Sequence, residues 1–271
     1  MLKKLKARLA YDSLRPPNHK GYIAYIKRKI RNKKVIPNRT LSIFINRYCN
    51  LNCYSCGALG MNPKPDETSI EEIELFLDLF KDYEPNSTVV ITGGEPTMID
   101  TAKLRKICAL IHISGKKVGM LTNGYKLHPL TWFDYVNLDN HGVNAKDLVK
   151  WRVALKESGR WYEETDKTYH QDMRYAMLAN ITKGFRCNSL MQPLTLWKDV
   201  IYPCCNAMCV EWWINNDDVT RALRKAEWTI HNPDIVKTVW CWRETLPPEF
   251  YRLCTIKCWK HASKAKWRLI T

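Results

Sequence analysis

Three cysteines in the first quarter of the chain have a spacing that suits an iron–sulfur cluster. Cys49, Cys53 and Cys56 form a C-x3-C-x2-C pattern, so one tight loop can present three thiols to a cubane. A [4Fe–4S] cluster is normally held by four thiolates, and three protein ligands leave one iron open to an outside ligand. The pattern therefore predicts a cluster that binds a small molecule at its open iron.

Three strand-like runs each end at a polar motif. The runs are rich in β-branched and apolar residues, which is typical of buried strands. Residues 40–45 lead into the cysteines, residues 88–92 lead into Gly93, Gly94, Glu95 and Pro96, and residues 117–122 lead into Asn123. Chemistry in (β/α) folds collects at the carboxyl ends of parallel strands. We therefore expect an α/β sheet that carries these motifs along one edge.

The ordered set of motifs resembles the radical S-adenosylmethionine (SAM) superfamily over residues 40–139. The resemblance implies a partial (β/α)6 TIM-like barrel in which Cys49, Cys53 and Cys56 hold the [4Fe–4S] cluster. It also implies that Gly93, Gly94, Glu95 and Pro96 bind the methionine amine of SAM. Reductive cleavage of SAM would then give a 5′-deoxyadenosyl radical that abstracts hydrogen from a substrate.

Two positions near the cofactor leave alternatives open. Family members usually carry an aromatic residue directly before the third cysteine, whereas here that residue is Ser55 and the aromatic residue is Tyr54. We therefore expect Tyr54 to contact the adenine, although its position departs from the family pattern by one residue. Asn123 could reach the SAM carboxylate or ribose, or it could serve only as the turn residue of Asn-Gly.

Helical patterns between the strands complete the expected core. They cover residues 69–82, with Thr68 or Ser69 as the N-cap, then residues 99–114 and 146–158. Cys108 falls within the second helix and is interpreted as a core thiol. A fourth strand, expected near residues 135–138, is followed by further rim candidates for SAM or substrate contact: Asp139, Asn140, His141 and Asn144.

Composition restricts the class of protein. The 271 residues hold 11 cysteines, and no apolar run approaches the ~18–20 residues of a membrane span. The N-terminus shows no secretory signal pattern, so the cysteines are interpreted as metal ligands in a reducing cytoplasm rather than as disulfides.

The positive charge is concentrated in an N-terminal arm, residues 1–39. This arm holds 13 Lys and Arg against one acid, whereas residues 40–271 hold 30 basic and 26 acidic side chains. The arm is either a helix packed on the core with its charges solvated, or a contact for an anionic membrane surface or an acidic partner. Binding of nucleic acid is the least favoured interpretation.

A second cysteine group lies in residues 181–271, after a core predicted to span residues 40–180. Between Cys187 and Cys204, residues 194–202 are expected to form a hairpin. This cysteine group resembles the twitch domain, a shortened SPASM extension, which implies one auxiliary [4Fe–4S] cluster held by Cys187, Cys204, Cys254 and Cys258. A structural zinc knuckle from the same thiols is the alternative. Three further cysteines in this region could each replace one of these ligands: Cys205, Cys209 and Cys241.

The reaction and its substrate are less constrained. The favoured hypothesis is oxidation or epimerisation of a carbohydrate-like or other small metabolite, with flavodoxin or ferredoxin as electron donor. The alternative is radical modification of a peptide or protein side chain, and a zinc- and RNA-binding module is the hypothesis from another class. Cys209 or Cys205 could return a hydrogen atom to a substrate radical, although a buried thiol is the favoured interpretation of both.

Overall fold

The computed structural model describes residues 40–51, 66–83, 87–166, 169–171, 194–203, 208, 217–240, 246–247 and 267–269. The chain divides into two units at Pro37, and all of these residues belong to the second unit, Asn38–Thr271. The predicted arm, residues 1–39, lies outside the described residues.

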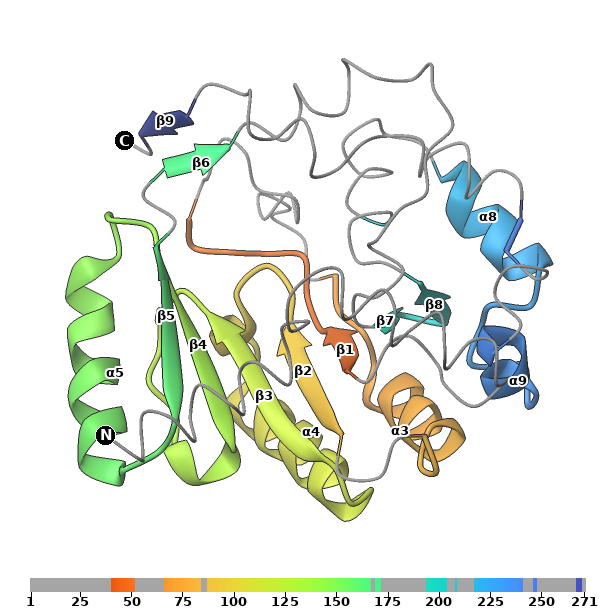
Figure 1. Cartoon of the computed structure of the whole chain (residues 1–271), viewed down its shortest axis with the longest axis horizontal. Helices are drawn as coiled ribbons and strands as arrows, with labels where there is room; N and C mark the ends of the chain where they lie inside the picture. The colour runs from red at the N-terminus through yellow and green to blue at the C-terminus, as the bar shows by residue number, and fades with distance from the viewer. Residues whose placement is uncertain are drawn as a thin grey trace, which may run out of the picture. The chain divides into compact units, whose positions relative to one another are not determined.

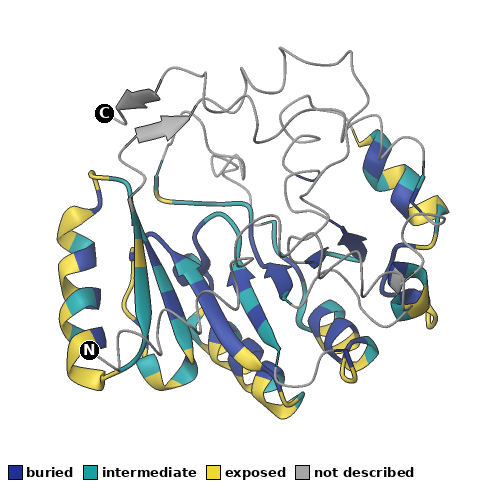
Figure 2. Ribbon diagram, in the orientation of Figure 1, coloured by how far each residue is buried: buried dark blue, intermediate teal, exposed yellow. Residues whose placement is uncertain are grey.

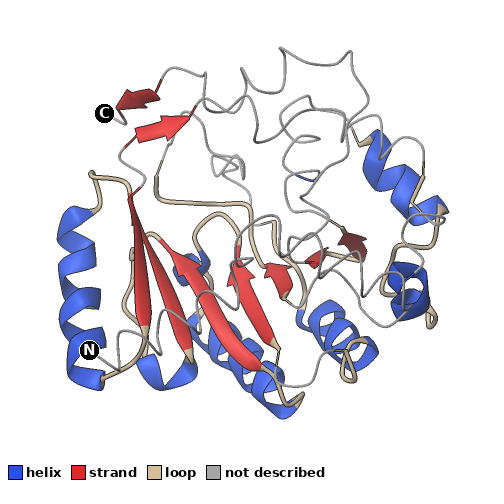
Figure 3. Ribbon diagram, viewed as in Figure 1, coloured by secondary structure: helices blue, strands red, loops and turns tan. Residues whose placement is uncertain are grey.

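Strands and helices alternate through the first two thirds of this unit (Figure 3). In chain order the elements are β1 Leu41–Phe44, α3 Ile70–Leu79, β2 Thr88–Thr92, η1 Pro96–Met98, α4 Thr101–Ile113, β3 Lys117–Thr122, η2 Leu130–Trp132, β4 Tyr135–Asn140, α5 Ala145–Ser158, β5 Tyr162–Asp166, β6 Tyr169–Gln171, β7 Leu194–Trp197, β8 Val200–Tyr202, α8 Asp218–Lys225, α9 Ile235–Trp240 and β9 Trp267–Leu269.

The main sheet has seven strands in the order β5-β4-β3-β2-β1-β7-β8 (Figure 1). All neighbouring strands from β5 to β7 are parallel, and β8 runs antiparallel to β7. Because parallel strands end at the same edge, the segments after β1, β2, β3 and β4 meet along one rim. β6 and β9 form a separate two-stranded antiparallel sheet.

The helices cover the sheet with apolar stripes. Helix α3 packs against α4, α4 against β3, and α5 against β4. Each of these helices has a buried face, and the opposite faces of α4 and α5 are exposed (Figure 2). All four residues of β1 are buried, which is expected of a strand covered on both faces. Ser69 caps α3 in a capping box with Glu72.

The α/β fold with a parallel-sheet core is confirmed, and so are most element positions. Strands β2 and β3 have the predicted bounds, Ser69 is the N-cap of the two that were predicted, and the hairpin expected over residues 194–202 is β7–β8. The sixth parallel strand, β7, lies beside β1 rather than after β5. The sheet therefore includes strands on both sides of residue 180, which was the predicted end of the core. The division into three domains stays a prediction.

Among the described residues, no helix combines the length and apolar character that crossing a membrane requires.

Candidate active site

Residues 46–67, which contain the three cysteines and are called the cysteine segment below, follow β1, and the two ends of this segment are hydrogen-bonded to each other. Asn46 pairs with Glu67 in an antiparallel bridge, and the N–H of Arg47 donates to the carbonyl of Asp66 at 3.0 Å. Lys198, in the turn between β7 and β8, places its ammonium 2.6 Å from the Asp66 carboxylate. The hairpin beside β1 therefore helps to fix the base of the cysteine segment.

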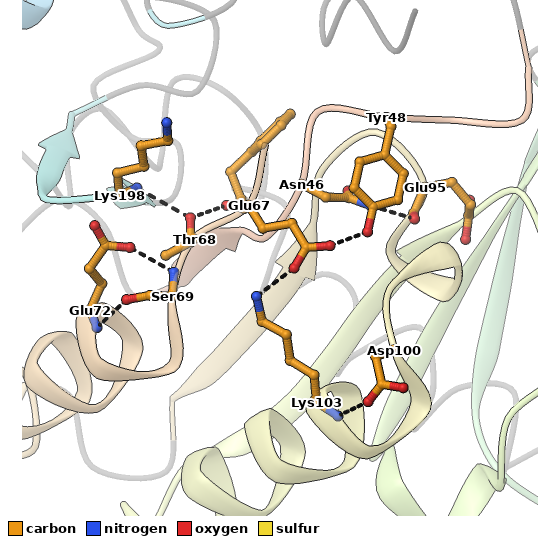
Figure 4. Close-up of polar contacts among 11 residues, drawn as sticks. Asn46, Tyr48, Glu67, Thr68, Ser69, Glu72, Glu95, Asp100, Lys103 and Lys198 are labelled. Atoms are coloured by element: carbon orange, nitrogen blue, oxygen red, sulfur yellow. Dashed lines mark hydrogen bonds and ion pairs between the residues drawn. The ribbon is translucent and has the colours of Figure 1, made fainter. Parts of the chain in front are cut away.

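Tyr48, the residue before Cys49, is tied to helix α4 through Glu67 (Figure 4). Its hydroxyl donates to one oxygen of the Glu67 carboxylate, and Lys103 donates to the other oxygen at 2.6 Å. Burial raises the pKa of Tyr48 well above its usual range, and the hydrogen bond and charge of Glu67 act in the same direction. The hydroxyl therefore remains a neutral donor at physiological pH, and the position of Cys49 is coupled to α4.

The glycines after β2 lie directly against the first residues of the cysteine segment. The N–H of Gly94 donates to the Asn46 carbonyl, and the N–H of Glu95 donates to the Tyr48 carbonyl, both at 2.8 Å. A Cβ on Gly94 would lie 2.1 Å from the Tyr48 carbonyl oxygen, and one on Gly93 would lie 2.4 Å from Asn46 Oδ1. The resemblance implies that these glycines bind SAM, and the structure shows a second reason for glycine at both positions, because a Cβ would collide with the chain.

The Glu95 carboxylate joins the ends of β2 and β3. Its Oε1 accepts from the N–H of Thr97 at 3.0 Å and from the hydroxyls of Thr97 and Thr122, each at 2.5 Å. Its Oε2 accepts from the N–H of Asn123 at 2.7 Å. Each carboxylate oxygen offers about two acceptor positions, so the three donors crowd Oε1, whereas Oε2, with one donor among the described residues, keeps one position. Glu95 is only 1% exposed.

The donors around Glu95 are oriented to favour its charged form. The Thr122 hydroxyl accepts from the N–H of Gly124 at 2.9 Å, and the Thr97 hydroxyl accepts from the N–H of Lys126 at 3.2 Å. Each hydroxyl therefore points its own hydrogen at the carboxylate. Burial raises the pKa of Glu95, whereas the bonds from Thr122, Thr97 and Asn123 act to lower it.

The side chain of Asn123 reaches back to the cysteine segment. Its Nδ2 lies 3.3 Å from Cys49 Sγ and 2.9 Å from Asn50 Oδ1. Its Oδ1 accepts from the N–H of Tyr125 at 3.1 Å, so the turn role is present as well. The N–H of Leu51 is a second donor to Cys49 Sγ, also at 3.3 Å. Three predicted motifs, Cys49, Glu95 and Asn123, are thus joined by direct hydrogen bonds.

Asn144, at the start of α5, connects this group to the end of β4. Its Nδ2 donates to the carbonyls of Asn123 and Asp139, and its Oδ1 accepts from the N–H of His141 at 2.8 Å. Asn144 is buried, while the amide of Asn140 points to Glu164 at 3.1 Å. Of the four rim candidates, Asn144 therefore supports the site, and contacts of the others with SAM or substrate stay predictions.

Several predicted residues lie outside the described part of the chain: Cys53, Cys56, Tyr54, Cys187, Cys204, Cys205, Cys209, Cys241, Cys254 and Cys258. Pro96 is buried and begins η1. Cys108 is buried in α4 as predicted, and burial raises the pKa of its thiol to about 12, so it suits a core position rather than a ligand.

The sequence interpretation missed four residues that build the site: Asn46, Thr97, Thr122 and Tyr48. A signal for two of them was present. Thr122 is a hydroxyl residue at the end of a mostly apolar strand, and Thr97 directly follows the Gly-Gly-Glu-Pro motif. Asn46 and Tyr48 carried no comparable signal, because their contacts are made across long stretches of sequence.

The first prediction concerns the Glu95 carboxylate. Glu95→Gln places an amide NH2 against either the N–H of Asn123 or the three donors at Oε1, so at least one buried donor loses its acceptor. We expect the free energy of unfolding to fall by about 1–3 kcal/mol, measured by denaturant titration followed by circular dichroism.

Glu72→Gln is the matched control for this prediction. Glu72 also accepts a hydrogen bond from a backbone N–H, that of Ser69 at 2.7 Å, but a capping box accepts Gln equally well. Its effect should stay within about 0.5 kcal/mol. Equal effects of the two substitutions would show that the Glu95 network does not stabilise the fold.

The second prediction concerns the close approach at Gly94. Gly94→Ala forces a methyl group onto backbone atoms of Tyr48, which cannot turn aside, so the cysteine segment must separate from the end of β2. We expect a loss of about 3 kcal/mol or more in the free energy of unfolding. Gly159→Ala, whose Cβ would meet nothing within 4 Å, should lose only about 1 kcal/mol from its left-handed backbone. Similar losses would contradict the packing argument.

The chain is similar in sequence to several known proteins. Two curated archaeal proteins are similar to the chain, both named probable GTP 3′,8-cyclase. The protein of Thermoplasma volcanium is 32% identical over 146 residues, which cover 45% of this chain and 43% of the relative. The protein of Sulfurisphaera tokodaii is 34% identical over 111 residues, covering 41% of this chain and 35% of the relative. The chain thus spans less than half the length of these relatives.

A solved structure supports the fold over a longer stretch. The structure of BtrN in complex with AdoMet and 2-DOIA superimposes with a TM-score of 0.53 over 84% of this chain and 90% of that chain, at 13% sequence identity. At this identity the likeness concerns the fold alone.

The family comparison matches the stretch that carries the joined motifs. Residues 43–164, from β1 into β5, match the Radical SAM superfamily, and this stretch contains Cys49, Glu95 and Asn123. Residues 43–164 therefore form a domain of the radical SAM superfamily.

Proposed function

We propose that the chain is a radical SAM enzyme that holds a [4Fe–4S] cluster through Cys49, Cys53 and Cys56. The observation that carries this proposal is the junction of the three motifs: Asn123 Nδ2 lies 3.3 Å from Cys49 Sγ, and the N–H of Asn123 lies 2.7 Å from Glu95 Oε2. A cluster ligand and the residues of the SAM motif therefore belong to one rigid group.

The surroundings of Cys49 suit an iron-bound thiolate. Its half-buried sulfur faces the N–H of Leu51 and the side-chain amide of Asn123. Donors of this kind stabilise negative charge on sulfur. The Tyr48 carbonyl, next to it in sequence, is fixed by Glu95, so the backbone that presents the thiol is already in place.

With cluster and SAM bound, one electron from the cluster would break the sulfonium C–S bond of SAM, giving methionine and a 5′-deoxyadenosyl radical that would abstract hydrogen from the substrate. The chain's own part is to bind and orient. Glu95 would receive the methionine ammonium at the acceptor position left on Oε2, a contact suited to its charged form. Gly93, Gly94 and Pro96 would shape the floor of the site, and Tyr54 would contact the adenine.

The sequence left open a direct contact between Asn123 and SAM, but the hydrogen bonds of Asn123 favour a supporting role. Both hydrogens of its amide already have acceptors, Cys49 Sγ and Asn50 Oδ1, and its oxygen is used by Tyr125. A direct contact with the SAM carboxylate or ribose would have to replace one of these bonds. Its main role is therefore to support the cysteine segment.

The proposed substrate is a small metabolite, oxidised or epimerised after hydrogen abstraction, and peptide side-chain modification is the alternative. The relatives' name, GTP 3′,8-cyclase, makes GTP one of the small molecules to test first. The similarity covers less than half of those proteins, so it supports shared SAM chemistry more than a shared substrate. Incorporation of deuterium from a labelled candidate into 5′-deoxyadenosine identifies the substrate.

The electron donor and location are also proposals. A flavodoxin or ferredoxin would supply the electron in a cytoplasmic setting. The basic arm, with 13 Lys and Arg against one acid, would favour an acidic donor protein or the surface of an anionic membrane.

The third prediction tests the cluster. After anaerobic reconstitution, Cys49→Ala should lose the SAM-binding cluster and form no 5′-deoxyadenosine from SAM and dithionite. Cys108→Ala, which removes a buried core thiol, should keep both the cluster and the reaction. The measurements are iron and sulfide per chain and chromatography of the products. A Cys49→Ala protein that still cleaves SAM would contradict the proposed ligand set.

The fourth prediction tests the auxiliary cluster, proposed for Cys187, Cys204, Cys254 and Cys258. With two cubanes the reconstituted chain should hold about eight irons, four per cubane. Cys187→Ala should bring this to about four and leave the EPR signal that responds to SAM unchanged. An unchanged iron content would exclude Cys187 as a ligand, and zinc in place of the missing iron would favour the zinc knuckle.

A further inference from the structure

Asn123 occupies the junction between the cysteine segment and the ends of β2 and β3. Its side chain bonds to Cys49 and Asn50, and its backbone N–H bonds to Glu95. We infer that Asn123 is a positioning residue that sets the reduction potential of the SAM-binding cluster through its hydrogen bond to Cys49 Sγ. This inference rests on the proposed function, because it requires Cys49 to be a cluster ligand.

The orientation of the Asn123 amide follows from its partners. Oδ1 accepts from the N–H of Tyr125 at 3.1 Å, while Nδ2 faces Asn50 Oδ1 at 2.9 Å and Cys49 Sγ at 3.3 Å. A flipped amide would set two donors against each other at Tyr125 and two oxygens against each other at Asn50. The NH2 group therefore faces the sulfur.

The backbone of Asn123 is fixed on both sides. Its N–H donates to the buried Glu95 carboxylate at 2.7 Å, and its carbonyl accepts from the side chain of Asn144, a residue only 2% exposed. The residue that donates to Cys49 Sγ therefore follows β3 and is held by its backbone to the end of β2 and to the start of α5. Leu51 supplies the other donor to the sulfur from within the cysteine segment itself.

A hydrogen bond to a cluster thiolate favours the reduced state. The extra electron increases negative charge on the sulfurs, so a donor at the sulfur stabilises the reduced form more than the oxidised form. Hydrogen bonds to the sulfurs are among the factors that set the potential of iron–sulfur clusters. Removal of the Asn123 donor should therefore make the cluster harder to reduce.

The chain offers a closely matched control residue. Asn140, at the end of β4, also accepts at Oδ1 from the N–H two residues later, Gly142, at 2.9 Å. Its Nδ2 donates to Glu164 at 3.1 Å instead of to a cysteine. Asn140 thus has the same turn at the same rim without the bond to Cys49.

The test compares midpoint potentials in EPR-monitored redox titrations of the reconstituted protein. Asn123→Ser keeps an acceptor for the Tyr125 N–H but is too short to reach the sulfur, and Asn123→Asp keeps the shape but replaces the donor with a charge. We expect both variants to titrate at more negative potentials than the original chain, Asn123→Asp more so. Asn140→Ser should leave the potential unchanged.

The outcomes separate this inference from the proposed function. The titration reports on iron-loaded molecules, so incomplete loading of one variant does not hide the result, and iron per chain is measured in parallel. An unchanged potential in Asn123→Ser would overturn the inference even if Asn123→Asp shifts, because that shift would be due to charge alone. An equal shift in Asn140→Ser would overturn it too. Failure of the original chain to load a cluster would instead overturn the proposed function.

Discussion

The site depends on one buried carboxylate. Glu95 accepts hydrogen bonds from Thr97, Thr122 and Asn123, and these donors come from two neighbouring strand ends. An uncompensated buried charge is strongly unfavourable, and burial raises the pKa of Glu95, so these donors are what stabilises its charged form. Since Asn123 in turn bonds to Cys49, the position of Cys49 follows from how the strand ends satisfy this charge.

The motif residues therefore have a structural role within the chain, beside the cofactor-binding role proposed for them. Gly94 allows the carbonyl of Tyr48 to approach, Glu95 connects β2 to β3, and Asn123 connects β3 to the cysteine segment. A motif of this kind is constrained twice, by the ligand and by the packing of its own backbone. Substitutions at these positions will consequently mix effects on stability with effects on chemistry, which is why matched controls are needed.

Much of the core was predictable because local patterns determine it. Strands β2 and β3, the Ser69 cap and the β7–β8 hairpin follow from periodicity and capping residues. Strand β5 was missed because its sequence, Tyr162 to Asp166, is largely charged; ion pairing of Arg152 with Glu164 and pairing with β4 hold it in the sheet. The place of β7 beside β1, and the partners of Glu95, arise from contacts distant in sequence that no local pattern encodes.

The pairing of β1 with β7 has a consequence for synthesis of the protein. Leu41 lies opposite Leu194, so one edge of the strand that leads to the cysteines stays unpaired until the ribosome has translated well past residue 194. Contacts between such distant segments form slowly, and open strand edges invite aggregation. A nascent chain exposes this edge directly before Cys49, so protection by a chaperone is most valuable until β7 has been synthesised and can pair with β1.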